Sequence, residues 1–149
     1  MKLVFVVYDL VRPPVKAVNN AGRESTGFSN GILVDTTAPN PPLAVDYGDY
    51  SLVNNVLQVY VIASDAESGI DRYKLSLGTM EEPGSVFNDR EIMTDGGAEN
   101  LTFSSLSLSD GEIYFFTVSA INNASSISLD ATSDGIMVDA DLKENWVPS

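Results

Sequence analysis

Apolar and polar residues alternate along several short segments of this 149-residue chain. A period of two places successive side chains on opposite faces of a β-strand, so each such segment predicts a strand with one buried face. The clearest is 113–121, rich in β-branched and aromatic residues, in which Tyr114, Phe116 and Val118 share a face. Further strands are predicted at 56–63, 70–77, 101–106 and 135–138, with a short edge strand near 85–87.

Glycine and proline mark the ends of these segments. Ser68-Gly69 and Asp110-Gly111 are turn dipeptides, and Pro39 begins an extended approach to the first strand. No segment combines helical periodicity with capping residues. The pattern predicts an all-β, two-sheet antiparallel β-sandwich of about seven strands. Ten apolar side chains are expected in its core: Leu57, Val59, Tyr73, Leu75, Leu101, Phe103, Leu106, Tyr114, Phe116 and Val118.

Two segments near the start of the chain recur near its end. Residues 15–21 (Val-Lys-Ala-Val-Asn-Asn-Ala) return at 118–124 as Val-Ser-Ala-Ile-Asn-Asn-Ala, and 29–35 return at 133–139, with offsets of 103 and 104 residues. A repeat of about 100 residues is the size of one β-sandwich module. We therefore expect three parts: residues 1–37 as the C-terminal strands of a preceding repeat or extra strands, 38–139 as a complete sandwich, and 140–149 as a tail or linker.

The first copy of the repeat differs from the second at one strand. Pro13 and Pro14 align with Phe116 and Thr117, and a central strand cannot lose two backbone donors. The strand in the first copy is therefore expected to be truncated, bulged or at an edge. Because unpaired edges invite pairing, we expect this segment to be either poorly ordered or completed by a neighbouring module or chain.

The strand at 113–121 carries a recognisable pattern, Tyr114-x-Phe116-x-Val118-x-Ala120-x-Asn122. It resembles the Tyr-x-Val-x-Val-x-Ala-x-Asn signature of the sixth strand of fibronectin type III domains, and Leu108 stands where that family places the leucine of its tyrosine corner. Residues 65–73 with Gly78-Thr79 resemble a signature of fibronectin-type and immunoglobulin-like repeats, and 34–39 resemble the junction between such repeats. The tryptophan of the second strand is absent, and Tyr60 takes its place.

This resemblance implies a non-catalytic module of a larger exported or cell-surface protein, acting as a spacer or as an adhesion or protein-interaction unit. Its expected partners are neighbouring repeats, other proteins or glycans, and its expected location is extracellular or at the cell surface. The alternative is a carbohydrate- or calcium-binding accessory module of an extracellular protein. The apolar run at residues 3–8 is too short to be an export signal, so if the parent protein is exported, its signal is expected upstream.

The composition of the chain excludes several kinds of catalytic and binding site. The chain has no histidine and no cysteine, which excludes a Ser-His-Asp or Cys-His arrangement within it and any disulfide framework. Its 8 basic and 21 acidic residues give a net charge of −13, which disfavours nucleic-acid binding. No run of 18 apolar residues occurs, so membrane insertion is not expected. Carboxylates alone can hydrolyse glycosides, but a small sandwich offers little cleft for them, so no enzyme is expected.

The candidate sites lie in turns and on strands. Asp65, Glu67 and Asp71 surround one turn and could supply oxygen ligands to calcium, alone or with Asp35 or Asp139; the alternative is a solvated loop in which the aspartate caps the turn. Beyond this possible calcium, no cofactor is expected. Asn100 and Asn123 begin glycosylation sequons, which matter only in a eukaryotic secretory setting. Tyr47 and Tyr50 either stack on sugars or pack against the first strand.

Overall fold

The computed structural model describes residues 9–95 and 97–140, which divide into two compact units, Met1–Thr37 and Ala38–Ser149. The assignment of residues 1–37 to a preceding repeat and of 38–139 to a complete module stays a prediction. All but the first residue of the predicted tail at 140–149 lies outside the described residues. Every regular element among the described residues is a β-strand, as expected. The same residues include no helix long and apolar enough to cross a membrane.

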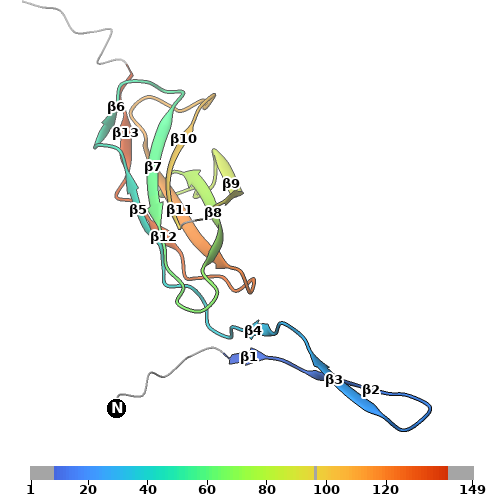
Figure 1. Cartoon of the computed structure of the whole chain (residues 1–149). Coiled ribbons are helices and arrows are strands. Elements are labelled where there is room, and N and C mark those ends of the chain that lie inside the picture. Colours follow the sequence, from blue (N-terminus) through green and yellow to red (C-terminus); the bar gives the residue numbers. More distant parts are fainter. Residues whose placement is uncertain (1–8, 96, 141–149) are drawn as a thin grey trace, which may run out of the picture. The chain divides into compact units, whose positions relative to one another are not determined.

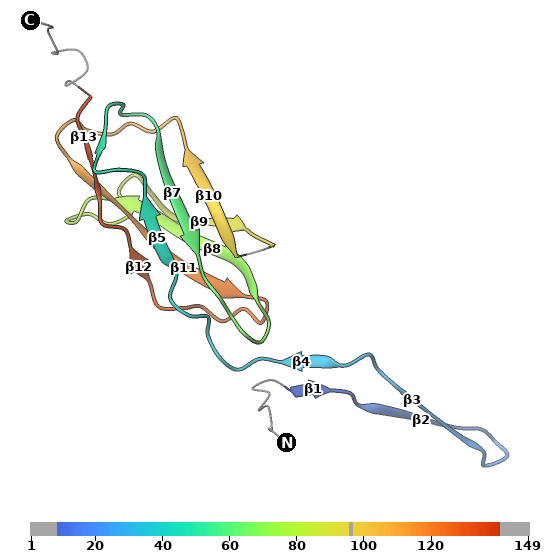
Figure 2. The same cartoon turned by 60° about the vertical axis from the view of Figure 1, so that its left-hand side comes forward.

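The second unit is a β-sandwich of two sheets (Figures 1 and 2). One sheet has three antiparallel strands in the order β10-β7-β5. The other has the order β6-β13-β11-β8-β9, with β12 also paired to β11. The first sheet consists of β5 (Leu43–Asp46), β7 (Leu57–Ile62) and β10 (Ala98–Phe103). The second consists of β6 (Tyr50–Ser51), β8 (Ile70–Gly78), β9 (Phe87–Met93), β11 (Ile113–Asn122), β12 (Ala131–Thr132) and β13 (Ile136–Val138).

The core lies between the two sheets and follows the alternation in the sequence. In β7 every second side chain is buried, and in β8 Tyr73, Leu75 and Leu77 are completely inaccessible to solvent. Eight of the ten predicted core residues are buried, while Leu101 and Leu106 are half-buried and pack against the cluster. Burying an apolar side chain of this size contributes about 1.5–3 kcal/mol, so this cluster supplies most of the favourable free energy of folding.

The strand β11 begins with a buried tyrosine that fixes the loop before it. The Tyr114 hydroxyl accepts a hydrogen bond from the backbone N–H of Ser109 at 2.9 Å, and Leu108 beside it is 5% exposed. A tyrosine near the start of this strand that bonds the backbone a few residues upstream is the tyrosine corner of immunoglobulin-like sandwiches.

Two strands of the second unit, β9 and β10, differ from the predicted bounds by more than one residue, and β5, β6 and β12 are not predicted. β10 covers Ala98–Phe103 rather than 101–106, because Ser105 has a φ of 58° and the chain leaves the ladder there. β9 is longer than the predicted edge strand near 85–87, since its polar sequence is that of an exposed edge and gives no alternation to detect. β5 follows the proline-rich approach and alternates over only four residues, too few for the pattern to show.

The described residues of the first unit form two successive two-stranded sheets. β1 (Asp9–Val11) pairs with β4 (Ile32–Val34), and β2 (Pro14–Val18) pairs with β3 (Glu24–Phe28), all antiparallel. β1 and β2 are separated by Arg12 and Pro13, where no strand forms, as the two prolines predict. Every side chain from residue 11 to residue 28 is exposed.

Candidate functional site

The loop between β7 and β8 is organised by one carboxylate. Asp65 Oδ1 accepts the backbone N–H groups of Glu67, Ser68 and Gly69 at 3.0, 2.9 and 3.3 Å. Its Oδ2 accepts the side-chain N–H of Asn122 at 3.0 Å. Both oxygens are therefore engaged with donors of the protein, which is the turn-capping alternative of the sequence analysis.

The other two proposed calcium ligands do not join Asp65 in a cluster. Asp71 forms an ion pair with Arg72, whose Nε lies 3.3 Å from Glu91 Oε2. Glu67 is half-buried in the loop that Asp65 caps. Within residues 9–95 and 97–140, no three acidic side chains gather closely enough to hold a metal ion. A calcium site at Asp65, Glu67 and Asp71 stays a prediction that only an experiment with the ion tests.

The two sequon asparagines are exposed, and their side chains are hydrogen-bonded. Asn100, on β10, accepts the hydroxyl of Tyr47 at 2.5 Å. Asn123 donates its amide N–H to the carbonyl oxygen of Ser68 at 2.8 Å. The bond of Asn123 ties the β7–β8 loop to the end of β11.

The tyrosines near the start of the second unit are not packed into it. Tyr47 and Tyr50 are 51% and 63% exposed, so neither ring is buried in the core, and their packing against the first strand stays a prediction. Both line a shallow hollow of about 280 Å³, together with Gln58. Exposed aromatic rings beside a polar amide are one arrangement that binds sugars, by stacking and by hydrogen bonding.

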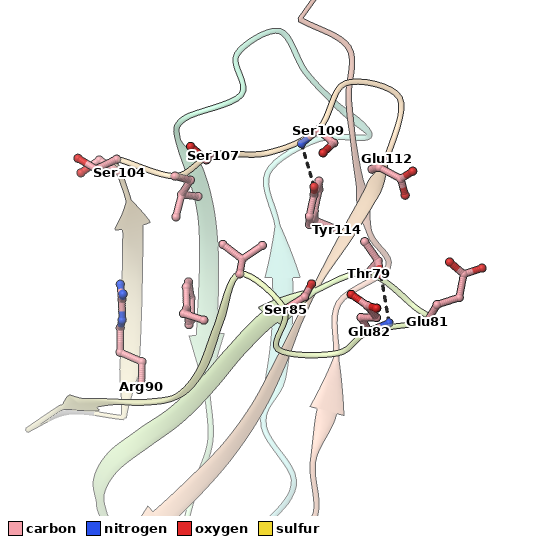
Figure 3. Close-up of a pocket in the computed structure, with 14 residues that line it drawn as sticks. Thr79, Glu81, Glu82, Ser85, Arg90, Ser104, Ser107, Ser109, Glu112 and Tyr114 are labelled. Carbon is pink, nitrogen blue, oxygen red and sulfur yellow. Dashed lines mark hydrogen bonds between the residues drawn. The ribbon is translucent and has the colours of Figure 1, made fainter.

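A larger groove of about 860 Å³ lies elsewhere on the second unit (Figure 3). Arg90 lies on one side of it, with its guanidinium carbon 4.3 Å from the centre of the Phe87 ring, a cation–π contact. Glu82 and Glu112 lie on the other side, and the backbone N–H of Glu82 donates to Thr79 Oγ1 at 3.1 Å. The groove is open and polar. Because it carries both positive and negative side chains, its charge does not indicate one class of ligand.

Sequence reasoning missed this groove. It is built from the β8–β9 loop, the strand β9 and the β10–β11 loop, which are far apart in the sequence. Each of these segments is an ordinary polar loop or edge by composition. Only the pairing of β8 with β9 brings Arg90 toward the serines that follow β10.

The strand order and the tyrosine corner define the second unit as a fibronectin type III-like, immunoglobulin-like β-sandwich, as the sequence motifs predict. The order β10-β7-β5 faces the order β9-β8-β11-β13, so β7 lies between β10 and β5 in one sheet and β11 lies between β8 and β13 in the other. This is the sheet division of that class of sandwich.

Two solved structures are similar to the chain. One is a structure of fibronectin(III)-like modules of Clostridium thermocellum CbhA, which is 16% identical in sequence to this chain. The matched region covers 91% of this chain and 66% of the CbhA chain, with a TM-score of 0.49. Titin module A71 from human cardiac muscle is 20% identical, covers 69% of this chain and 92% of the module, and has a TM-score of 0.41. The chain thus spans just under two thirds of the CbhA structure. No family model and no curated protein matches the chain.

Proposed function

We propose that the second unit is a non-catalytic module of a larger exported or cell-surface protein, in which it acts as a spacer or protein-interaction unit. The observation that carries this proposal is where the chain enters and leaves the sandwich. The backbone N–H of Asn40 donates to the carbonyl oxygen of Ser64, just after β7, at 3.0 Å. The backbone N–H of Asp139 donates to Ser51 O, before β7, at 2.8 Å.

The two chain ends are therefore held at opposite ends of the same strand. A strand rises roughly 3.3 Å per residue, so the six residues of β7 separate them by on the order of 20 Å. A module with ends at opposite poles can be strung in an array, with each copy adding a fixed length. The filled core leaves the surface loops as the places for contact with partners.

Site-directed spin labelling tests the spacer function. Because the chain has no cysteine, Asn40→Cys and Met137→Cys introduce the only two labelling sites. We expect one narrow distribution of distances between the labels, since both positions are anchored to the sandwich. A broad distribution would show that the ends are not held by the core and would contradict a spacer of fixed length.

The alternative function, an accessory module that binds carbohydrate, is favoured by the hollow beside Tyr47 and Tyr50. Titration of the full chain with a panel of soluble oligosaccharides tests it. Tyr50→Ala should abolish any binding in this hollow, whereas Arg90→Ala in the separate groove should leave it unchanged. No heat or fluorescence change with any sugar would leave the spacer function as the better account.

A further inference from the structure

The turn that joins the two halves of the first unit has an almost identical counterpart in the second. Asn19 Oδ1 accepts the backbone N–H groups of the second and fourth residues after it, both at 2.9 Å. Asn122 Oδ1 accepts the same two groups in its own turn, at 3.1 and 2.8 Å. The third residue after each asparagine has a positive φ, 81° at Gly22 and 68° at Ser125. The sequence repeat is therefore a repeat of hydrogen bonding.

The strand register is also the same in the two units. Adding 103 to the numbers in β1 and β2, and 104 to those in β3 and β4, converts four pairs of the first unit into pairs of the second. The break in the ladder falls at the same place in both. The pairs are Leu10–Leu33, Val11–Ile32, Pro14–Phe28 and Val15–Gly27 in the first unit, and Ile113–Met137, Tyr114–Ile136, Thr117–Thr132 and Val118–Ala131 in the second.

Equivalent residues differ in their exposure. Side chains of β11 and β13 that face the core are almost inaccessible to solvent, whereas those at the same positions of the first unit are open to it. Exposure is 48% at Val11 against 5% at Tyr114, 70% at Val15 against 0% at Val118, 66% at Ile32 against 3% at Ile136, and 40% at Val34 against 0% at Val138. The first unit thus carries the core face of a strand pair whose core is not supplied by its own described residues.

The edge of β2 leads to the same conclusion. In the second unit, β11 is hydrogen-bonded to β8 on one side and to β12 and β13 on the other. In the described part of the first unit, β2 is paired only with β3. The backbone N–H and C=O groups along its other edge are thus available to a strand that stands where β8 stands.

We propose that strands β1, β2, β3 and β4 together form a docking surface for a five-stranded partial sandwich. This partner has counterparts of β5, β7, β8, β9 and β10 but none of β11, β12 and β13. The partner strand equivalent to β8 pairs with β2, and the partner's core covers Val11, Val15, Ile32 and Val34. Val11 and Pro13 stand where the second unit has Tyr114 and Phe116, so the partner carries larger side chains opposite them. This holds whether or not the second unit acts as a spacer.

The second unit itself provides a five-stranded segment that can stand in for the proposed partner. Residues 38–111, which contain β5 to β10, are fused directly ahead of Asp9 of the chain, because Asp9 is the equivalent of Glu112. Amide hydrogen exchange is then followed at 15–18 with and without the fused segment. We expect exchange there to slow by about 100-fold or more on fusion, because the amides enter a ladder and a core. Exchange in β11 is the internal reference.

Matched variants in the hairpin test the assigned face. Val15→Asp places a charge at the position of buried Val118 and should abolish the protection. Thr26→Asp places the same charge at the position of exposed Asp130 and should leave the protection intact. If both variants behave alike, the proposed face is wrong.

A third variant shows whether the small side chain at Val11 is what prevents the fused segment from packing against β1 and β2. Val11→Tyr restores the ring and hydroxyl that Tyr114 has in the second unit. Protection of residues 15–18 in the fused chain that keeps Val11 supports the proposal. Protection only in the fused chain with Val11→Tyr also supports it, and shows that the native partner fills the gap at residue 11. Unprotected amides in both fused chains overturn it.

Discussion

The side-chain amide of Asn122 donates a hydrogen bond to Asp65 Oδ2 at 3.0 Å and joins two loops at one end of the sandwich. Each partner also organises its own loop. Asp65 caps the turn after β7, and Asn122, completely buried, holds the turn after β11. A buried amide bonded to a carboxylate is stable only while both partners are present, because either one alone would be left with unsatisfied polar atoms.

Asp65→Ala should lower the free energy of unfolding by about 2 kcal/mol, since it removes the acceptor of three backbone N–H groups and of the Asn122 amide. Chemical denaturation measures the change. Asp95→Ala is the matched control, because Asp95 is an exposed aspartate nearby, and it should change stability by less than about 0.5 kcal/mol. Equal effects of the two substitutions would show that the capping bonds contribute nothing.

Calcium should leave the melting temperature unchanged. Both oxygens of Asp65 already accept N–H donors, so an ion would compete with these donors for the carboxylate. Thermal unfolding in millimolar calcium and in chelator measures this. A calcium site at Asp65, Glu67 and Asp71 would instead raise the melting temperature, since a bound ion at a hundredfold excess over its Kd stabilises by about 2.7 kcal/mol. Loss of such a rise in Asp65→Asn would identify the ligand.

Tyr114→Phe should destabilise the second unit by about 1 kcal/mol, because the ring still fills the core while the N–H of Ser109 loses its acceptor. Urea unfolding gives the difference. Tyr50→Phe removes an equivalent hydroxyl from an exposed ring and serves as the control, with no measurable effect expected. A loss of several kcal/mol in Tyr114→Phe would mean that the corner fixes more than one hydrogen bond.

Asp46 should make the stability of the protein depend on pH. Burial raises the pKa of this carboxyl above its ordinary value, and the neighbouring Asp134 acts in the same direction, although hydrogen bonds from Ser133 and Gly135 oppose them. Because the folded state favours the protonated form, its contribution to stability is complete below the unfolded pKa, about 4, and is lost as pH rises through the folded pKa.

The variant Asp46→Asn isolates this effect, since the amide is uncharged at every pH and its oxygen still accepts the N–H of Gly135. We expect the variant to be the more stable protein at neutral pH and its advantage to shrink as pH falls toward about 4. Unfolding free energies measured across this range give the difference. A difference that stays constant with pH would show that Asp46 has no shifted pKa.

The sequence predicts the second unit well wherever its information is periodic. The core strands β7, β8 and β11 alternate between apolar and polar residues, and each lies within one residue of its predicted bounds. The edge strand β9 is harder to predict, because it is mostly polar and shows no alternation. The groove is harder to predict because Arg90 reaches it through the pairing of β9 with β8. The spacing of Asp65 alone fits either a turn or a cation, and the structure adds the capping hydrogen bonds, while the calcium site itself stays a prediction.

The two copies of the repeated turn offer a final test, at the position where they differ. Ser125 has a φ of 68°, and the first unit has Gly22 there with a φ of 81°. The left-handed region costs a residue with a Cβ about 1–2 kcal/mol, whereas glycine loses about 0.5–1 kcal/mol more chain entropy on folding. Ser125→Gly should therefore raise the unfolding free energy by about 0.5–1 kcal/mol. Ala124→Gly, next to it at a negative φ, should lower it instead, and a loss of stability in both variants would show that the turn is not strained at Ser125.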